Sequence, residues 1–485
     1  DPCTCTTARC IINSSETILS VHVICIASTA IHLISPFHDF EFVFMKLFFS
    51  VAGLCLFLIG CKPAGDYKKF TNDPLLYSKT VKKLNDVVLG NNFPPMIGSR
   101  NYVYASIAAY ECIVAGDAKY QTLSGQIKHM PPMPKPDTSK PVDYSLAALL
   151  SFTKVGNAVT FPEGSMMDHY NELTEKADSA GIPSDILENT IAFSDTIVAT
   201  IMKWSKGDNY AATRGAERFT VREEDGRWMP TPPMYATAIE PQWGKIRTMV
   251  LDSSTQFEIP RPPVFDVTNK NSTYYKALME VKHVGDSLTE EQKHIADFWD
   301  DNPFKMNVSG HVMFATKKFS PPGHWLNIVG IAAKAANADF NSTVGAYAIT
   351  SIAFFDAFIR GWEEKYTSNY VRPETAINKH VDQEWRPYIQ TPPFPSYVSG
   401  HATNSSAAAE TMTSWFGDQL SFTDTSLLEF GIANREIKSF RAAAAEAAMS
   451  RLYGGIHYRF DNDEGLKVGK QVGELIVSRL KLRVQ

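Results

Sequence analysis

Cysteine is scarce in most of this chain. Six of its seven cysteines lie at or before residue 61, and only Cys112 follows. The body of the protein therefore has no internal disulfide and depends on burial of apolar side chains for its stability. The early CTCTTARC stretch, residues 3–10, resembles a metal-binding cluster, but it falls in a segment that we expect to lie outside the mature protein.

A strong net charge is also missing. The 485 residues include 47 Lys and Arg against 52 Asp and Glu, a net charge of −5. No basic run of the kind that nucleic acid requires is present, so we expect no nucleic-acid partner. The composition, 44% hydrophobic and 12% aromatic, is that of a globular protein able to bury a large core.

A hydrophobic run long enough for an ordinary membrane span is missing from MKLFFSVAGLCLFLIGCKPA, residues 45–64, the strongest candidate for such a span. Its apolar run has about 14 residues, whereas a spanning helix needs about 20. Met45 and Lys46 before that run give the layout of a secretory signal. The LIGC sequence resembles a bacterial lipobox, with Cys61 as the lipidated residue. The alternatives are a plain transmembrane anchor here, or a membrane segment at residues 17–34.

This pattern predicts the domain organisation. Because the chain starts with Asp1 rather than Met, residues 1–44 are expected to be upstream read-through. Residues 45–60 form the predicted signal peptide, 61–72 a tether, and 73–485 one helical domain. We therefore expect an exported lipoprotein, on the periplasmic or outer-membrane face, that meets the membrane only through a lipid anchor at Cys61.

From about residue 73, apolar residues recur at steps of three and four, which predicts an all-α fold, a large single-domain helical bundle. Residues 342–366 are apolar nearly all round and predict a central core helix. Asp356 and Arg360 within it argue against a membrane span. Proline-rich residues 207–270 predict an irregular segment packed over the helices. The last helices are expected at about 401–416, 428–453 and 463–480.

A first group of cations lies in KYTSNYVRP, residues 365–373. Lys365 and Arg372 are seven residues apart, so on one helix they would share a face. Pro373 favours extended geometry at Arg372 and should end the helix there. Alone, the pair is equally typical of a solvated helix end.

A second group opens a predicted helix in PPFPSYVSGHATNSSAAAE, residues 392–410. Ser399, Gly400 and His401 stand where unpaired N–H groups attract an anion. His401 can exchange protons near neutral pH. Ordinary helix capping is the alternative interpretation.

The third group is SRLYGGIHYRFD, residues 450–461. Arg451 ends an alanine-rich helix that Gly454 and its neighbour should stop. His457 precedes Asp461 by four residues, a spacing at which the carboxylate can fix which imidazole nitrogen faces a site. A lone histidine would more often be structural.

Together the three segments resemble the signature of the family that unites vanadium-dependent haloperoxidases with type 2 phosphatidic acid phosphatases and bacterial acid phosphatases. That signature is Lys-x6-Arg-Pro, then Pro-Ser-Gly-His, then Ser-Arg-x5-His-x3-Asp. The matching residues here are Lys365, Arg372, Pro373, Ser399, Gly400, His401, Ser450, Arg451, His457 and Asp461. Val398 replaces the family's usual proline. The resemblance covers residues 362–461 and implies the family's helical fold.

The resemblance implies a site for vanadate, or for a phosphoryl group in transit. Lys365, Arg372 and Arg451 would neutralise the equatorial oxygens, and the arginines can do so with paired hydrogen bonds. The Ser399 hydroxyl and the Gly400 N–H would add donors where the helix begins.

The two histidines would take different roles. His457, oriented by Asp461, would be the metal ligand in a haloperoxidase, or would attack phosphorus in a phosphatase. His401 would be the acid–base group. The resemblance thus assigns His401, His457 and Asp461 as catalytic.

Residues around the motifs favour the haloperoxidase. Trp362 and Phe394 occupy positions where fungal chloride-oxidising haloperoxidases carry aromatics, and are predicted to form a halide pocket; ordinary core packing is the alternative. In FWDDNP, residues 298–303, Asp300 or Asp301 is expected to support His401. His311 and His324 are interpreted as structural.

We therefore expect a vanadate-dependent haloperoxidase that uses hydrogen peroxide and a halide. A phosphatase acting on a phosphate ester through a phosphohistidine is the first alternative. A non-catalytic oxyanion-binding lipoprotein is the second, although pure binding needs neither His401 nor the pair of His457 and Asp461.

Overall fold

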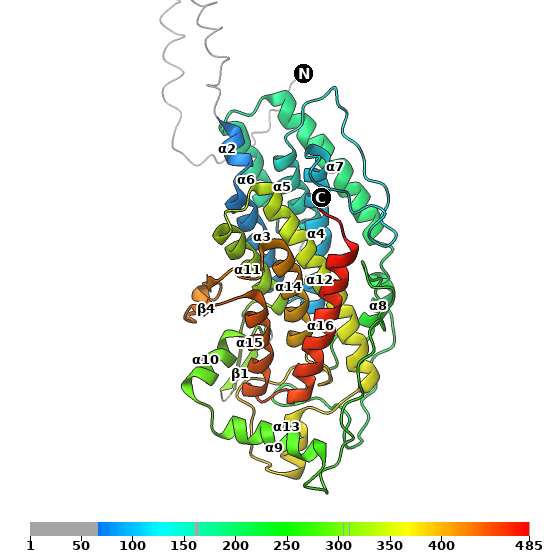
Figure 1. Ribbon diagram of the computed structural model, residues 1–485, viewed down its shortest axis with the longest axis vertical. Helices are drawn as coiled ribbons and strands as arrows, with labels where there is room; N and C mark the ends of the chain where they lie inside the picture. The colour runs from blue at the N-terminus through cyan, green and yellow to red at the C-terminus, as the bar shows by residue number, and fades with distance from the viewer. Residues whose placement is uncertain (1–65, 161–163, 304, 310, 485) are drawn as a thin grey trace, which may run out of the picture. The chain divides into compact units, whose positions relative to one another are not determined.

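The computed structural model describes residues 66–484, except 161–163, 304 and 310. The predicted signal peptide, Cys61 and the early cysteines lie outside the described residues, so the structure does not test the lipoprotein prediction. Within the described part, the elements run along the chain as helices with four short strands (Figure 1).

The elements are α2 (Tyr67–Thr71), α3 (Pro74–Gly90), α4 (Pro95–Gly116), α5 (Tyr144–Val159), α6 (Met167–Ser179), α7 (Ser184–Ser205), α8 (Tyr210–Arg214), η1 (Trp243–Lys245), α9 (Thr273–Asp286), α10 (Glu290–Phe298), β1 (Lys305–Ser309), β2 (Val312–Thr316), α11 (Pro321–Ala335), α12 (Phe340–Ser368), α13 (Pro373–His380), α14 (Gly400–Phe416), β3 (Phe422–Asp424), η2 (Leu428–Phe430), β4 (Arg435–Ile437), α15 (Phe440–Tyr453) and α16 (Arg459–Arg479). β1 pairs antiparallel with β2, and β3 with β4. The predicted all-α class is confirmed.

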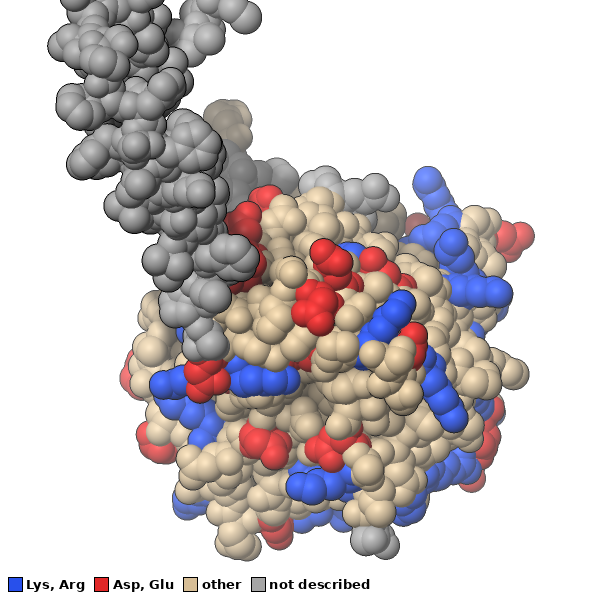
Figure 2. Space-filling model, turned by 90° about the horizontal axis from the view of Figure 1, so that it is seen from above, with Lys and Arg blue, Asp and Glu red and all other residues tan. Residues whose placement is uncertain are grey.

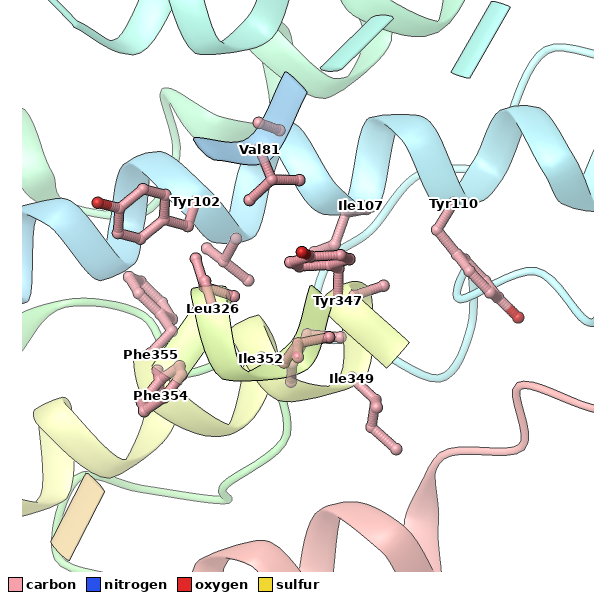
Figure 3. Packing of buried hydrophobic residues seen from close by; sticks show 14 of the residues in the cluster. Val81, Tyr102, Ile107, Tyr110, Leu326, Tyr347, Ile349, Ile352, Phe354 and Phe355 are labelled. Atoms are coloured by element: carbon pink, nitrogen blue, oxygen red, sulfur yellow. The ribbon is translucent and has the colours of Figure 1, made fainter. Parts of the chain in front are cut away.

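Helix α12 is the centre of the bundle, as its apolar sequence predicted. It alone among the described helices is long and apolar enough to cross a membrane, yet 94% of its most apolar window is buried inside the protein. Figure 3 shows Tyr347 and Ile352 of α12 facing Ile107 of α4 and Leu326 of α11. Burial of this surface supplies the main stabilisation, since Cys112 is the single cysteine of the described residues and is free.

The irregular segment predicted at 207–270 is confirmed, because α8 and η1 are its only described helices. It is fastened to the core through Asp356, which is fully buried in α12. The Asp356 carboxylate accepts from the backbone N–H groups of Met249, Val250 and Leu251 at 2.6–2.9 Å. This buried carboxylate therefore organises the loop at residues 249–251.

Helices α14 and α16 lie unusually close, because α16 presents a stripe of glycines. A Cβ atom built on Gly469 would stand 2.1 Å from the Thr403 carbonyl oxygen. One on Gly473 would stand 2.7 Å from the Ala407 carbonyl oxygen. The close approach brings together the first turns of the two helices, which carry His401 and Asp461.

One local prediction was wrong and another was confirmed. The helix expected over 428–453 begins only at Phe440, since Gly431 takes a left-handed conformation (φ 73°) and Ser439 caps the new helix at the Ala442 N–H. Lys365 and Arg372 do not share a helix: α12 ends at Ser368, and Arg372 is extended just before α13, as Pro373 predicted.

The charged side chains of the visible face are mixed in sign. Figure 2 shows Lys and Arg interspersed with Asp and Glu there. This distribution agrees with the nearly balanced composition of the chain.

Candidate active site

The three sequence motifs converge on one buried place. Arg372 Nη1 donates to His457 Nε2 at 3.0 Å, which joins the first motif to the third. The Lys365 ammonium donates to the carbonyls of Ser396 and Val398, next to Ser399 in the second motif. Residues separated by almost a hundred positions therefore line one site.

His457 is held in one orientation by Asp461. Its Nδ1 lies 2.8 Å from Asp461 Oδ2, and the side chain is 3% exposed. Burial, followed by the charges of Arg372 and Lys365, lowers the pKa of His457 well below its usual value. The imidazole is therefore neutral, with a proton on Nδ1 and a lone pair on Nε2 that accepts from Arg372 Nη1.

Asp461 is itself buried and supported. Burial raises the pKa of its carboxyl to about 6, against the opposing effects of the Ser396 hydroxyl, Lys365 and Arg372. Ser396 Oγ donates to the same oxygen that meets His457. Ser396 was not singled out in the sequence, although it lies three residues before Ser399 in the second motif.

Three cations surround this imidazole, and all are buried. Burial lowers the pKa values of Arg372 and Arg451, but guanidinium groups stay protonated at neutral pH. Lys365 has three backbone acceptors, the third being Pro395. Burial, then the charge of Arg372, lowers the pKa of Lys365 well below its usual value, whereas the three carbonyl acceptors favour the ammonium form and fix the loop before Ser399.

Several polar atoms at the site are buried without a hydrogen-bond partner. Among them are Arg372 Nη2, Arg451 Nε and His401 Nε2. A buried donor without an acceptor costs about 1–3 kcal/mol, and more when it is charged. An oxyanion would satisfy such donors, so the residues present fit vanadate.

The start of α14 contributes further donors. Ser399 is fully buried, and its hydroxyl caps the helix at the Ala402 N–H, 3.5 Å away. Gly400 begins the helix, where backbone N–H groups lack intrahelical partners. A Cβ on Gly400 would lie 3.8 Å from Lys365 Cε, which places this turn against the cations.

His401 lies near the cations of the site. Burial, then the charges of Arg451, His324 and Lys365, lowers its pKa well below its usual value, while a backbone contact with Trp299 opposes this. The neutral imidazole can accept a proton. Its side chain retains 15% exposure.

The sequence did not decide whether Asp300 or Asp301 lies beside His401, and the structure distinguishes them. Asp301 Oδ2 lies 3.7 Å from His401 Nε2. Asp300 instead lies 3.6 Å from both Lys305 and Lys318. Asp301 is thus the carboxylate that lies beside His401.

Trp362 and Phe394 meet at the site, with ring centroids 5.0 Å apart. The Lys365 ammonium lies 5.1 Å from the Phe394 ring, and the Arg372 guanidinium lies 5.0 Å from it. The two aromatics thus form an apolar wall against the cations, and their role as a halide pocket stays a prediction.

A pocket reaches this cluster from outside. Phe394, Arg451 and Asp301 line it, together with the prolines at 303, 392 and 393. A second pocket adjoins it and shares Pro303, Gln390 and Pro393 with it. Reactants thus have a route toward Arg451.

His324 was interpreted from the sequence as structural, and Asp424 was not considered. In the structure, His324 is fully buried between Asp301 and Asp424. No sequence signal marks this group, because its contacts join residues 23 and 100 positions apart. Within the described residues, no group of three or more His, Cys, Asp or Glu is arranged to hold a metal cation.

The comparisons agree with this geometry. The model of the VCPO second helical-bundle domain matches residues 346–485, which contain all three motifs. The crystal structure of a bacterial vanadium-dependent iodoperoxidase is 38% identical, with a TM-score of 0.80 over 85% of this chain and 98% of that one.

Crystal structures of a bacterial vanadium-dependent chloroperoxidase, in holo and apo form, share the fold. They are 18% identical, with TM-scores of 0.61, over 80% of this chain and 93–94% of theirs. No curated protein matches the chain. The chain belongs to the vanadium-dependent haloperoxidases, a family of peroxidase-type oxidoreductases.

Proposed function

We propose that this enzyme binds vanadate at His457 and uses hydrogen peroxide to oxidise a halide, with iodide as the preferred one. The observation that carries the vanadate site is the pair of buried, unpartnered donors on Arg372 and Arg451. Support for iodide is the 38% identity to a protein described as an iodoperoxidase.

The cations and the helix start would hold the oxyanion. Arg372 Nη2 and Arg451 Nε offer charged donors, and Ser399 and Gly400 offer a hydroxyl and a backbone N–H. Lys365 adds its charge, and a bound anion would favour its protonated form against the effect of burial. Vanadate, when bound, supplies a Lewis-acidic centre that makes hydrogen peroxide a stronger oxidant.

The two histidines would have different chemical roles. Nε2 of His457 carries the lone pair for vanadium, since Asp461 holds the proton on Nδ1. Neutral His401 accepts a proton from hydrogen peroxide. In the overall reaction the halide loses two electrons, the O–O bond breaks and one proton is consumed, giving hypohalous acid and water.

The apolar wall of Trp362 and Phe394 would receive the halide. A large, weakly hydrated anion loses less free energy than a strongly hydrated one when it leaves water for an apolar wall, and Lys365 and Arg372 lie within about 5 Å of the Phe394 ring, close enough to attract it. This arrangement suits iodide better than a strongly hydrated halide.

The test compares vanadate-free protein with protein reloaded with vanadate. We expect triiodide formation with hydrogen peroxide only after reloading, and slower halogenation of monochlorodimedone with bromide. Iodide oxidation that does not depend on vanadate contradicts the proposal. Hydrolysis of p-nitrophenyl phosphate that vanadate inhibits, without halide oxidation, favours a phosphatase instead.

We also propose that the enzyme is exported and anchored by a lipid at Cys61. The support is the signal-like run from Met45 to the LIGC sequence. Expression of the full chain in bacteria with radiolabelled palmitate should label the wild type and not Cys61→Ala. Equal labelling of Cys61→Ala contradicts the anchor.

A further inference from the structure

His324 lies between two carboxylates in the fully buried core. Its Nδ1 is 2.9 Å from Asp301 Oδ1, and its Nε2 is 2.9 Å from Asp424 Oδ2. All three side chains are at most 1% exposed. Both ring nitrogens must donate to satisfy both carboxylates, so His324 is an imidazolium.

Asp301 links this ion triad to the active site. Its second oxygen, Oδ2, has no hydrogen-bond partner and lies 3.7 Å from His401 Nε2, which also has none. The Asp301 backbone is in the left-handed region (φ 36°), uncommon for a residue other than glycine. Such constrained backbone is found mostly at functional sites, where surrounding contacts impose it.

We propose that His324 is a positioning residue for His401: as a cation clamped by Asp424, it fixes the Asp301 carboxylate beside the His401 imidazole. This inference rests on the proposed role of His401 as proton acceptor. A neutral His324 could donate to only one of the two carboxylates, which would leave the other without its donor.

The charges around His401 give the triad a second effect. His401 faces Asp301, Arg451, His324 and Lys365, and the carboxylate is the one anion among them. His324 in turn faces Asp301 and Asp424, and its ring lies 4.9 Å from that of Trp299. Loss of the His324 charge would leave Asp301 uncompensated, and Asp301 would then favour protonated His401.

Two carboxylates raise the pKa of His324 to about 10 against the effect of burial. The charge would therefore persist through the working pH range, and His401 would remain ready to accept a proton. A purely structural triad would give stability but would not affect the protonation of His401.

The first test is nitrogen-15 NMR of the histidine-labelled full chain without vanadate. The His324 signals are assigned by their loss in His324→Gln. We expect both His324 ring nitrogens to be protonated at pH 8 in the wild type. A neutral tautomer at pH 7 overturns the proposal, whether or not the enzyme oxidises halide.

The second test measures kcat/KM for hydrogen peroxide against pH in wild type, His324→Gln and Asp424→Asn. We expect the acidic limb, which reports His401, to move upward by about one pH unit in His324→Gln and less in Asp424→Asn. The Kd for vanadate should stay within about twofold, because neither side chain reaches the proposed anion donors.

His169→Gln is the matched control. Its imidazole also lies near a carboxylate, Glu172 at 3.3 Å, but on α6, which contributes nothing to the site. The acidic limb of the pH profile of His169→Gln should fall at the same pH as that of the wild type. Lost activity with an unmoved acidic limb in both triad variants overturns the positioning role. Absence of vanadate-dependent halide oxidation in the wild type would instead overturn the proposed function, and leaves the NMR result to decide the state of His324.

Discussion

At the scale of single residues, three imidazoles in one neighbourhood hold different charges. Burial and nearby cations lower the pKa values of His457 and His401, so both are neutral. His324 is equally buried, but two carboxylates raise its pKa to about 10. The proposed metal ligand, the proposed proton acceptor and the buried cation thus differ only in the neighbours of one residue type.

Arg451→Ala should weaken vanadate binding. Loss of one charged, preorganised donor costs about 2–4 kcal/mol, which is a rise in Kd of roughly 30- to 1000-fold. Equilibrium dialysis of the vanadate-free protein measures this directly. Arg441→Ala is the control, because Arg441 lies on the same helix but pairs with Glu410 and Asp418 near the surface. Equal Kd values for the two variants would contradict the assignment of Arg451.

Much of the candidate site could be predicted from residue spacing. Within each motif, the spacing of the residues fixes their relative positions. His457 and Asp461, for example, are four residues apart at the start of a helix, which places the carboxylate beside the imidazole. The triad of Asp301, His324 and Asp424 could not be predicted, since its members come from three separate elements. Only packing brings them together.

At the scale of elements, helix starts deliver the reactive groups and close helix packing aligns them. Ser399 and His401 open α14, while Asp461 lies in the first turn of α16. The glycine stripe of α16 allows the two helices to touch through their backbones. Helix positions were predicted from periodicity, whereas this contact depends on which faces meet.

Gly469→Ala should disturb the active site from a distance. The added Cβ would stand 2.1 Å from the Thr403 carbonyl oxygen, so α14 and α16 must separate. We expect a lower melting temperature and weaker vanadate binding together. Lys470→Ala, at the next and exposed position, should leave both unchanged. A Gly469→Ala protein with wild-type vanadate affinity would show that the helix contact does not align the site.

Asp356→Ala should destabilise the fold without touching the site. Three buried N–H groups would lose their acceptor, at about 1 kcal/mol or more each, so the free energy of unfolding should fall by at least about 3 kcal/mol. Urea denaturation followed by circular dichroism measures the change. Thr367→Ala, an exposed position on the same helix, serves as the control. A loss below about 1 kcal/mol would contradict the anchoring role of Asp356.

At the scale of the whole molecule, the described part combines an apolar bundle with a strongly ionic centre. The family match over 346–485 contains the three motifs. Asp301, the carboxylate beside His401, lies outside that range. The site therefore needs elements from before and within the matched region. The sequence predicted a helical bundle without internal disulfides, but it did not predict that the site depends on a residue from before the matched region.

Stability should fall as pH rises through the alkaline range. The folded-state pKa of His324, about 10, exceeds its ordinary value of 6.5. Its contribution is therefore complete below about pH 6.5 and is lost as pH approaches 10. The difference in unfolding free energy between wild type and His324→Gln should be on the order of a few kcal/mol at pH 6 and shrink toward pH 10. A difference that is constant over this range would contradict a charged His324.

The central claim is that a vanadate-loaded site forms on the Nε2 atom of His457. X-ray absorption at the vanadium edge, on protein reloaded with vanadate and freed of excess, tests it most directly. The account predicts about one vanadium per chain, bound by oxygens and a single imidazole nitrogen that disappears in His457→Ala. Vanadium that is absent from the wild type, or bound there by oxygen alone, would contradict it.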